Sequence, residues 1–199
     1  MTQFQRIIGI ILQGEWLSDL DEVINEFGNG RIILTMTSAE KLGDANYEIV
    51  KKIAAAKYRT IIITINNPSP LLKDIYRAKG IDISKVYFID AITKYALGAL
   101  PGDLDNSVFI NNPGNLTDIG IALTEMLKEN PDEKTCVIVD SINTMLIYLP
   151  TPTLTKFVHF LSSKLRLMKC FGFYLTVKEG IDPMLMMQLK TFSDESIEI

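Results

Sequence analysis

The sequence predicts an α/β fold in three layers, with helices on both faces of a central, mostly parallel sheet. Short apolar runs rich in β-branched residues alternate with longer segments of helical spacing. Several of these runs are apolar at every position, as is typical of strands buried on both faces of a parallel sheet. The 199 residues have an ordinary globular composition, with no repeat and no low-complexity linker. We therefore expect a single domain over residues 1–199, in which residues 1–30 form an N-terminal extension or an edge element.

The predicted elements alternate in order along the chain. The expected strands are 31–37, 60–65, 86–89, 108–110, 135–139, 171–177 and 196–199. The expected helices are 44–57, 70–79, 116–129, 153–169 and a shorter segment at 183–189. The first helix places Ile49 and Ile53 on one side and charges on the other, and the next two end at Gly80 and at the Asn130–Pro131 pair. This alternation indicates right-handed strand-helix-strand units in one doubly wound layer.

Composition excludes several classes of function. A net charge of -4 without a basic patch argues against nucleic acid as a partner. The apolar N-terminal stretch at 4–12 contains Gln5, Arg6 and Gly9 and has neither the charge layout nor the cleavage signal of an export peptide, and no stretch reaches spanning length, so we expect no membrane partner. Cys136 and Cys170 lie in apolar runs, where we expect buried thiols in a reducing, cytoplasmic compartment.

The end of the 135–139 strand carries the first candidate site. Ligands of open parallel sheets bind outside the carboxyl ends of the strands. Here an apolar strand ends in Asp140 and Ser141, the pattern in which an acid holds nucleotide-bound magnesium in P-loop proteins. An aspartate at a strand end also commonly caps the next helix, so both interpretations stay open at this point.

Three stretches resemble the RecA superfamily and, within it, the KaiC-like proteins of archaea and bacteria. The sequence VIVDSINTML at 137–146 is similar to the Walker B strand and its following segment. NNPSPLL at 66–72, with GID at 80–82 and VYFIDA at 86–91, is similar to the region where family ATPases carry paired glutamates and a glycine-aspartate turn. LTVKE at 175–179 and FSDESIE at 192–198 look like the last two core strands. The resemblance implies a RecA-like P-loop NTPase core.

The chain departs from this family at the residues that carry the chemistry. A phosphate loop needs glycines that free consecutive backbone amides and a lysine at the helix start. After the first strand the chain reads SAEKLGD, so the Walker A motif is degenerate. Lys41 is either a remnant of that motif or a solvated lysine in a turn, and Glu40 and Asp44 beside it would repel a triphosphate. Asn66 and Asn67 replace the glutamates, and amides cannot accept a proton at neutral pH.

These departures lead to three hypotheses. The first is a non-catalytic, pseudo-ATPase module in archaeal-type signalling or regulation that binds a protein partner or itself, with no cofactor expected and no catalytic residue assigned. The second is a weak nucleotide switch that holds ATP through Asp140, Ser141 and Lys41, with Asp140 directed to magnesium. The third is an enzyme of unrelated chemistry in which Asp90, Asp140 and Glu179 converge on a metal ion.

Two apolar stretches and one histidine stay outside these hypotheses. The methionine-rich segment at 183–189 is either a docking face or a helix packed on the edge of the sheet. The run at 142–150 lies where ring-forming relatives make subunit contacts, so the resemblance implies a possible homo-oligomer surface there. His159 has no histidine or cysteine at ligand spacing, and we expect a packed or surface residue.

Overall fold

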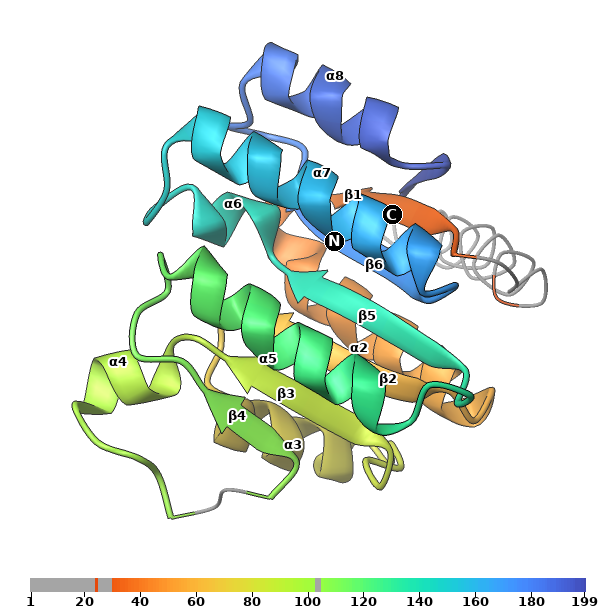
Figure 1. Ribbon diagram of the computed structural model, residues 1–199, viewed down its shortest axis with the longest axis vertical. Coiled ribbons are helices and arrows are strands. Elements are labelled where there is room, and N and C mark those ends of the chain that lie inside the picture. The colour runs from red at the N-terminus through yellow and green to blue at the C-terminus, as the bar shows by residue number, and fades with distance from the viewer. Residues whose placement is uncertain (1–23, 25–29, 103–104) are drawn as a thin grey trace, which may run out of the picture.

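The central sheet has seven strands in the order β4-β3-β2-β5-β6-β1-β7 (Figure 1). The computed structural model describes Ile24, residues 30–102 and residues 105–199. The strands are β1 (Ile32–Thr37), β2 (Arg59–Thr64), β3 (Val86–Asp90), β4 (Ser107–Phe109), β5 (Thr135–Asp140), β6 (Phe171–Val177) and β7 (Glu195–Glu198). All pairings between them are parallel. The sheet predicted from the sequence is therefore confirmed.

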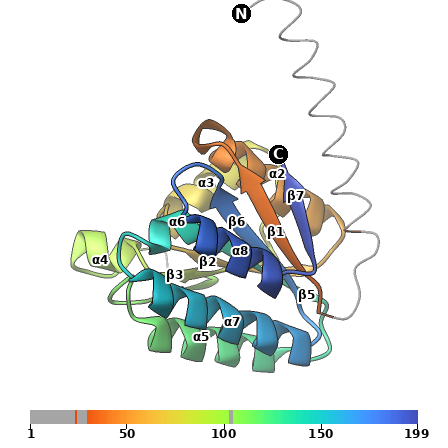
Figure 2. The same ribbon diagram turned by 90° about the horizontal axis from the view of Figure 1, so that it is seen from above.

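Helices cover both faces of the sheet, which gives three layers (Figure 2). The helical elements are η1 (Ala39–Lys41), α2 (Leu42–Ala55), α3 (Ser69–Ala78), α4 (Thr93–Leu97), α5 (Leu116–Glu129), α6 (Ile142–Met145), α7 (Thr151–Leu167) and α8 (Pro183–Phe192). Apolar side chains of α2 and α3 form one core cluster with the sheet, and those of α5, α6, α7 and α8 form the other. None of the helices in the described part of the chain has the length and apolar content to span a bilayer.

The alternation of side chains along β1 shows why its apolar run is continuous. Ile32 and Leu34 belong to the cluster under α5 and α7, whereas Ile33 belongs to the cluster under α2 and α3. Successive strand side chains point to opposite faces, so a strand covered on both sides needs apolar residues at every position. Ile24 joins the cluster under α2 and α3. The other residues of the expected extension at 1–30, except Gly30, lie outside the described residues.

Element boundaries differ from the predicted ones by a few residues, and the short helices α4 and α6 and the 3-10 element η1 were not predicted. Helix α7 begins at Thr151 because Pro152 stands in its first turn, where proline lacks only a hydrogen bond that no helix start can make. Between β3 and β4, where no helix was predicted, the chain forms α4, which is capped at its C-terminus by Gly98. Gly98 has a φ of 68°, a left-handed conformation that glycine adopts without steric cost.

Strand order decides which strand ends lie together. Strand β1 lies between β6 and β7, with Thr37 registered against Val177 and Met36 against Glu198. Because the strands are parallel, the residues that follow β1 and β6 emerge at the same edge as the end of β7.

Candidate functional site

The connection from β1 to α2 occupies the place where a phosphate loop would lie. Strand β1 ends at Thr37 and η1 begins at Ala39, so Ser38 is the only residue between them. The N–H of Lys41 donates to the carbonyl of Ser38 at 3.1 Å, which closes the turn. No residue from 38 to 44 has a positive φ. The segment is therefore a tight 3-10 turn, unlike a phosphate loop, whose consecutive amides converge on one anion.

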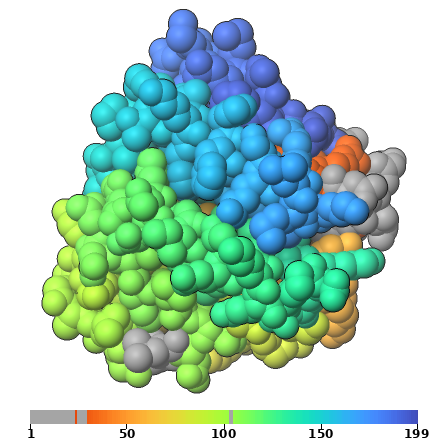
Figure 3. Space-filling view, in the orientation of Figure 1, coloured from red at the N-terminus to blue at the C-terminus, as the bar shows by residue number. Residues whose placement is uncertain are grey.

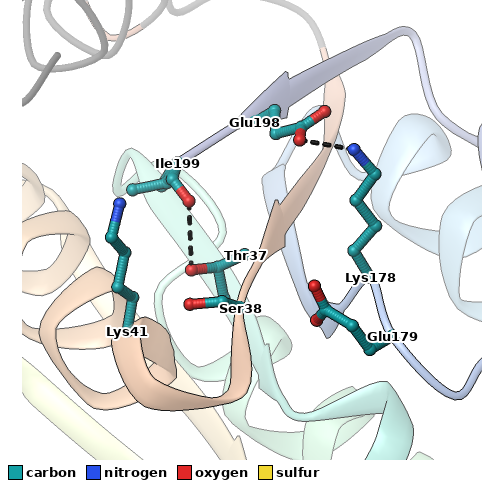
Figure 4. Close-up of a pocket in the computed structure, with 7 residues that line it drawn as sticks. All are labelled: Thr37, Ser38, Lys41, Lys178, Glu179, Glu198 and Ile199. Carbon is teal, nitrogen blue, oxygen red and sulfur yellow. Dashed lines mark hydrogen bonds and ion pairs between the residues drawn. The ribbon is translucent and has the colours of Figure 1, made fainter.

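A pocket of about 330 Å³ opens beside this turn (Figure 4). It is lined by Thr37, Ser38, Lys41, Lys178, Glu179, Glu198 and Ile199. Lys178 Nζ donates to Glu198 Oε1 at 2.5 Å, and this hydrogen bond raises the pKa of Lys178 above its ordinary value. The Thr37 hydroxyl donates to the carbonyl of Ile199 at 3.3 Å. Among described residues, none forms an ion pair with Lys41, so its charge is available to a ligand.

Asp140 does not line this pocket, although it was predicted to act with Lys41. Its side chain is only 2% exposed at the end of β5. One carboxyl oxygen, Oδ2, accepts from Nδ2 of Asn46 on α2 at 3.2 Å, and Oδ1 has no hydrogen-bond partner among the residues that the structure describes. Burial raises the pKa of Asp140 to about 7. The Oδ1 of Asn46 accepts in turn from the hydroxyl of Tyr76 on α3 at 2.5 Å. A buried chain of hydrogen bonds therefore runs from Tyr76 through Asn46 to the carboxyl group of Asp140.

Asn46 lies against the carboxyl group that would bind magnesium in a P-loop protein. In P-loop proteins the magnesium ion is held by the phosphate-loop Ser/Thr and by the acid of the Walker B strand. Here the amide of Asn46, on the helix that follows β1, is hydrogen-bonded to the acid of the matching strand. A neutral donor thus takes one of the two oxygens that would face a cation, and the remaining oxygen is enclosed by protein.

Ser141 has a local structural use. It is fully buried and forms the N-cap of α6, where its hydroxyl lies 3.0 Å from that of Thr144. The next residues tie α6 to β6, since Asn143 Oδ1 accepts from the N–H of Val177 at 2.6 Å. The peptide bond between Asp140 and Ser141 is cis. Of the three predicted nucleotide-binding residues, only Lys41 lies in the pocket.

The structure does not bring together the three acids of the third hypothesis. Asp90 is fully buried and accepts from the backbone N–H groups of Ser69 at 2.7 Å, Ile92 at 3.0 Å and Thr93 at 2.8 Å. Its carboxylate oxygens therefore accept hydrogen bonds from the N-terminal backbone of α3 and α4. The described residues contain no group of three His, Cys, Asp or Glu side chains that could hold a metal ion, so Asp90, Asp140 and Glu179 do not converge on one.

The remaining sequence-predicted residues lie away from the pocket. Asn66 is exposed, and the backbone carbonyl of Asn67 accepts from the Thr64 hydroxyl at 2.6 Å. Cys136 and Cys170 are free, buried thiols, as predicted. Exposed His159 contacts the ring of Phe192, with centroids 5.1 Å apart, which confirms the surface interpretation.

Both apolar stretches contribute side chains to the core and also have exposed ones. In α8, Leu185 and Leu189 are buried, so the helix packs on the sheet as the second interpretation expected. Met184 and Met187 are nevertheless 65% and 62% exposed. In the run at 142–150, Ile147 is the large apolar side chain that reaches solvent, at 74% exposed.

Sequence reasoning missed most of the pocket. Lys178 and Glu198 were seen as parts of the last two strands but were not assigned to a site. The signal that could have found them is the rule that ligands bind beyond the carboxyl ends of strands. Its use here requires knowing that β1 lies between β6 and β7, and that order is set by tertiary pairing.

Comparisons with known proteins agree with the architecture. The chain is similar to the solved structure of KaiC-like protein PH0186 from the hyperthermophilic archaeon Pyrococcus horikoshii, at 13% identity over 87% of this chain and 75% of that one, with a TM-score of 0.61. It is also similar to uncharacterized protein PH0321 from Pyrococcus horikoshii in complex with an unknown peptide, at 12% identity over 91% and 82% of the two chains, with a TM-score of 0.70. Flagellar accessory protein FlaH from Methanocaldococcus jannaschii matches at 12% identity over 90% and 76%, with a TM-score of 0.57.

These likenesses concern the fold, and they confirm the RecA-like, KaiC-type architecture that the sequence resemblance implied. The comparison with curated proteins found no match. A family model covers residues 39–199, which include every strand of the sheet after β1. The chain therefore belongs to the family of unknown function DUF7504.

Proposed function

We propose that this chain is a non-catalytic domain of RecA-like and KaiC-like fold that acts as a protein-interaction or regulatory module. The observation that carries the proposal is the closed turn between β1 and α2. Ser38 alone separates the strand from η1, and the turn amide of Lys41 is already bonded to Ser38. A triphosphate would find no loop of converging amides at the position where this fold places it.

Two further features support a module without hydrolysis. Asp140 is enclosed and bonded to Asn46, so a magnesium ion would have to displace that amide and desolvate a buried carboxylate. Asn66 and Asn67 stand where family ATPases carry glutamates, and an amide cannot accept a proton from the attacking water. ATP hydrolysis at this site would therefore lack a phosphate-binding loop, an open position for magnesium and a general base for the attacking water.

A peptide or protein is the ligand class that the comparisons favour. PH0321, which shares the fold with a TM-score of 0.70, was solved in complex with an unknown peptide. A fold that binds a peptide in one protein offers a surface for such binding in another, and we take this as support for a protein partner of this chain.

The test is isothermal titration calorimetry of the whole chain with magnesium-ATP, together with an assay of phosphate release. We expect no binding in the micromolar range and no release above the buffer rate. The matched variant is Asp140→Asn, which keeps the size of the side chain. Micromolar binding with turnover that Asp140→Asn abolishes would overturn the proposal.

The second candidate function is a weak nucleotide switch without turnover. The pocket beside Lys41 favours it, since this lysine forms no ion pair with a described residue and stands at the N-terminus of α2. Glu179 and Glu198 line the same pocket and oppose a polyphosphate by charge repulsion. A rise in melting temperature with ATP that is lost in Lys41→Ala but kept in Lys51→Ala, on an exposed part of α2, would favour this function.

A further inference from the structure

An apolar groove lies between α5 and α7, on the opposite side of the sheet from α2 and α3. It has a volume of about 390 Å³ and is lined by Leu116, Thr117, Gly120, Ile121, Thr124, Phe157 and Phe160. Ile121 and Phe160 are 52% and 47% exposed, so two large apolar side chains at the groove face solvent. Figure 3 shows this face, where the green surface of α5 meets the blue surface of α7.

The floor of the groove contains a glycine that the fold does not require. Gly120 lies inside α5, where glycine costs about 1 kcal/mol relative to alanine. A Cβ placed on Gly120 would meet Cε1 of Phe160 at 3.6 Å, which is an ordinary van der Waals distance. Alanine would therefore fit the folded chain, and its methyl group would fill the space between α5 and Phe160. The glycine keeps the groove open at a cost in helix stability.

Lysines flank the groove in a chain whose net charge is -4. Lys164 Nζ lies 5.6 Å from the centroid of the Phe160 ring. Lys156 precedes Phe157, and Lys128 follows Thr124 by four residues, which places it on the same side of α5. Within the part of the chain that the structure describes, these three lysines form no ion pair.

Fewer acidic residues than lysines lie near the groove, and one of them already accepts a hydrogen bond. Asp118 accepts from the side chain of Asn115 at 2.7 Å at the start of α5. Glu125 is exposed one turn beyond Ile121. The apolar floor is thus bordered by more unpaired positive than negative charge, and this complements an acidic ligand.

We propose that the groove between α5 and α7 binds an amphipathic helix of a protein partner. The apolar face of that helix would lie on the floor of the groove, and its acidic side chains would face the lysines. Two neighbouring helices with apolar side chains at helical spacing form the type of groove that accepts a third helix. The open position at Gly120 would take the ridge of that helix. This inference rests on the proposed interaction function for its biological meaning, and it adds a surface and the chemistry of the partner.

The test is a selection from a phage-displayed library of amphipathic helical peptides of about four turns, with the whole chain as bait. Peptides that bind the support without the chain are removed by counter-selection. We expect the enriched peptides to carry an apolar ridge and acidic flanks. Fluorescence anisotropy of the enriched peptides should show binding that weakens with added salt.

Variants then assign the binding to the groove. Gly120→Ala and Phe160→Ala should each weaken binding about tenfold or more, as a contact at the centre of an interface does. Lys164→Glu should weaken it further for acidic peptides. The matched control is Gly43→Ala in α2, since a Cβ there would meet the Tyr47 hydroxyl at the same distance of 3.6 Å, but away from the groove. This control should bind the peptides as the unchanged chain does.

Three outcomes would overturn the inference. These are the failure to enrich any peptide, enrichment of peptides that bind Phe160→Ala with unchanged affinity, and enrichment of basic flanks. Self-association of the chain that Gly120→Ala abolishes would assign the groove to a second copy and would also overturn it. The nucleotide titration is independent of the groove, so ATP turnover in a chain that binds the selected peptides would remove the proposed function alone.

Discussion

Asp90 and Asp140 end two strands that flank β2, and both are registered against the same residue, Thr64. Both are buried, at 0% and 2% exposed. Asp90 accepts from the backbone N–H groups that start α3 and the segment leading into α4. Asp140 accepts from Asn46 alone among described residues, and its Oδ1 has no partner.

The difference shows that the surroundings, and not the position at a strand end, decide what an aspartate does. Backbone donors point at Asp90 because the chain turns into helices on both sides of it. After Asp140 the cap of α6 is made by Ser141, so the carboxyl of Asp140 is left facing α2. A satisfied carboxylate stabilises the fold, whereas a buried oxygen without a donor disfavours the charged form.

The largest effect is expected for Asp90→Ala. This change leaves the N–H groups of Ser69, Ile92 and Thr93 without their acceptor, and it should lower the free energy of unfolding by about 3 kcal/mol or more. Urea denaturation followed by circular dichroism measures it. The control is Asp82→Ala, which removes an exposed carboxyl that accepts from the N–H of Ser84 and should cost much less. Equal losses in the two variants would contradict a special role for Asp90.

A smaller effect, dependent on pH, is expected for Asp140→Asn. The pKa of Asp140 in the folded chain, about 7, lies above its ordinary value of 3.8. The folded state therefore holds a proton that the unfolded state releases, and this stability is fully present below the ordinary value and is lost as the pH rises through about 7. From pH 4 to pH 8 the unchanged chain should lose on the order of 3 kcal/mol more than Asp140→Asn.

Urea denaturation of both chains at several pH values measures this difference. Asparagine keeps an oxygen that can accept from Asn46, so the variant should fold at every pH in the series. Parallel curves for the two chains would mean that Asp140 titrates as an exposed carboxyl does and that its environment is open.

The smallest effect is expected for Tyr76→Phe. The hydroxyl of Tyr76 donates to Asn46, which in turn donates to Asp140. Its loss should cost about 1 kcal/mol in the free energy of unfolding, because one buried acceptor loses its donor. Tyr95→Phe, whose ring is 53% exposed, is the control and should leave stability unchanged. A loss of similar size in both variants would show that the polar chain to Asp140 adds nothing.

The fold was predictable because its signals are local. Burial on both faces made β1, β2, β5 and β6 readable as continuous apolar runs, and their bounds agree with the expected ones to within a residue. The candidate site was predictable in part. Lys41 was found from its place after the first strand, whereas Lys178 and Glu198 join it only through the order of strands.

The sequence by itself determined the alternation of strands and helices, the missing glycines after β1 and the amides at Asn66 and Asn67, since these are properties of the chain's covalent order. Tertiary structure alone decided that Asn46 meets Asp140 and that Gly120 lies opposite Phe160. Residues far apart in the sequence meet only where sheet pairing and helix packing bring them together. The energies that select this arrangement are summed over the whole core and are not carried by any local pattern.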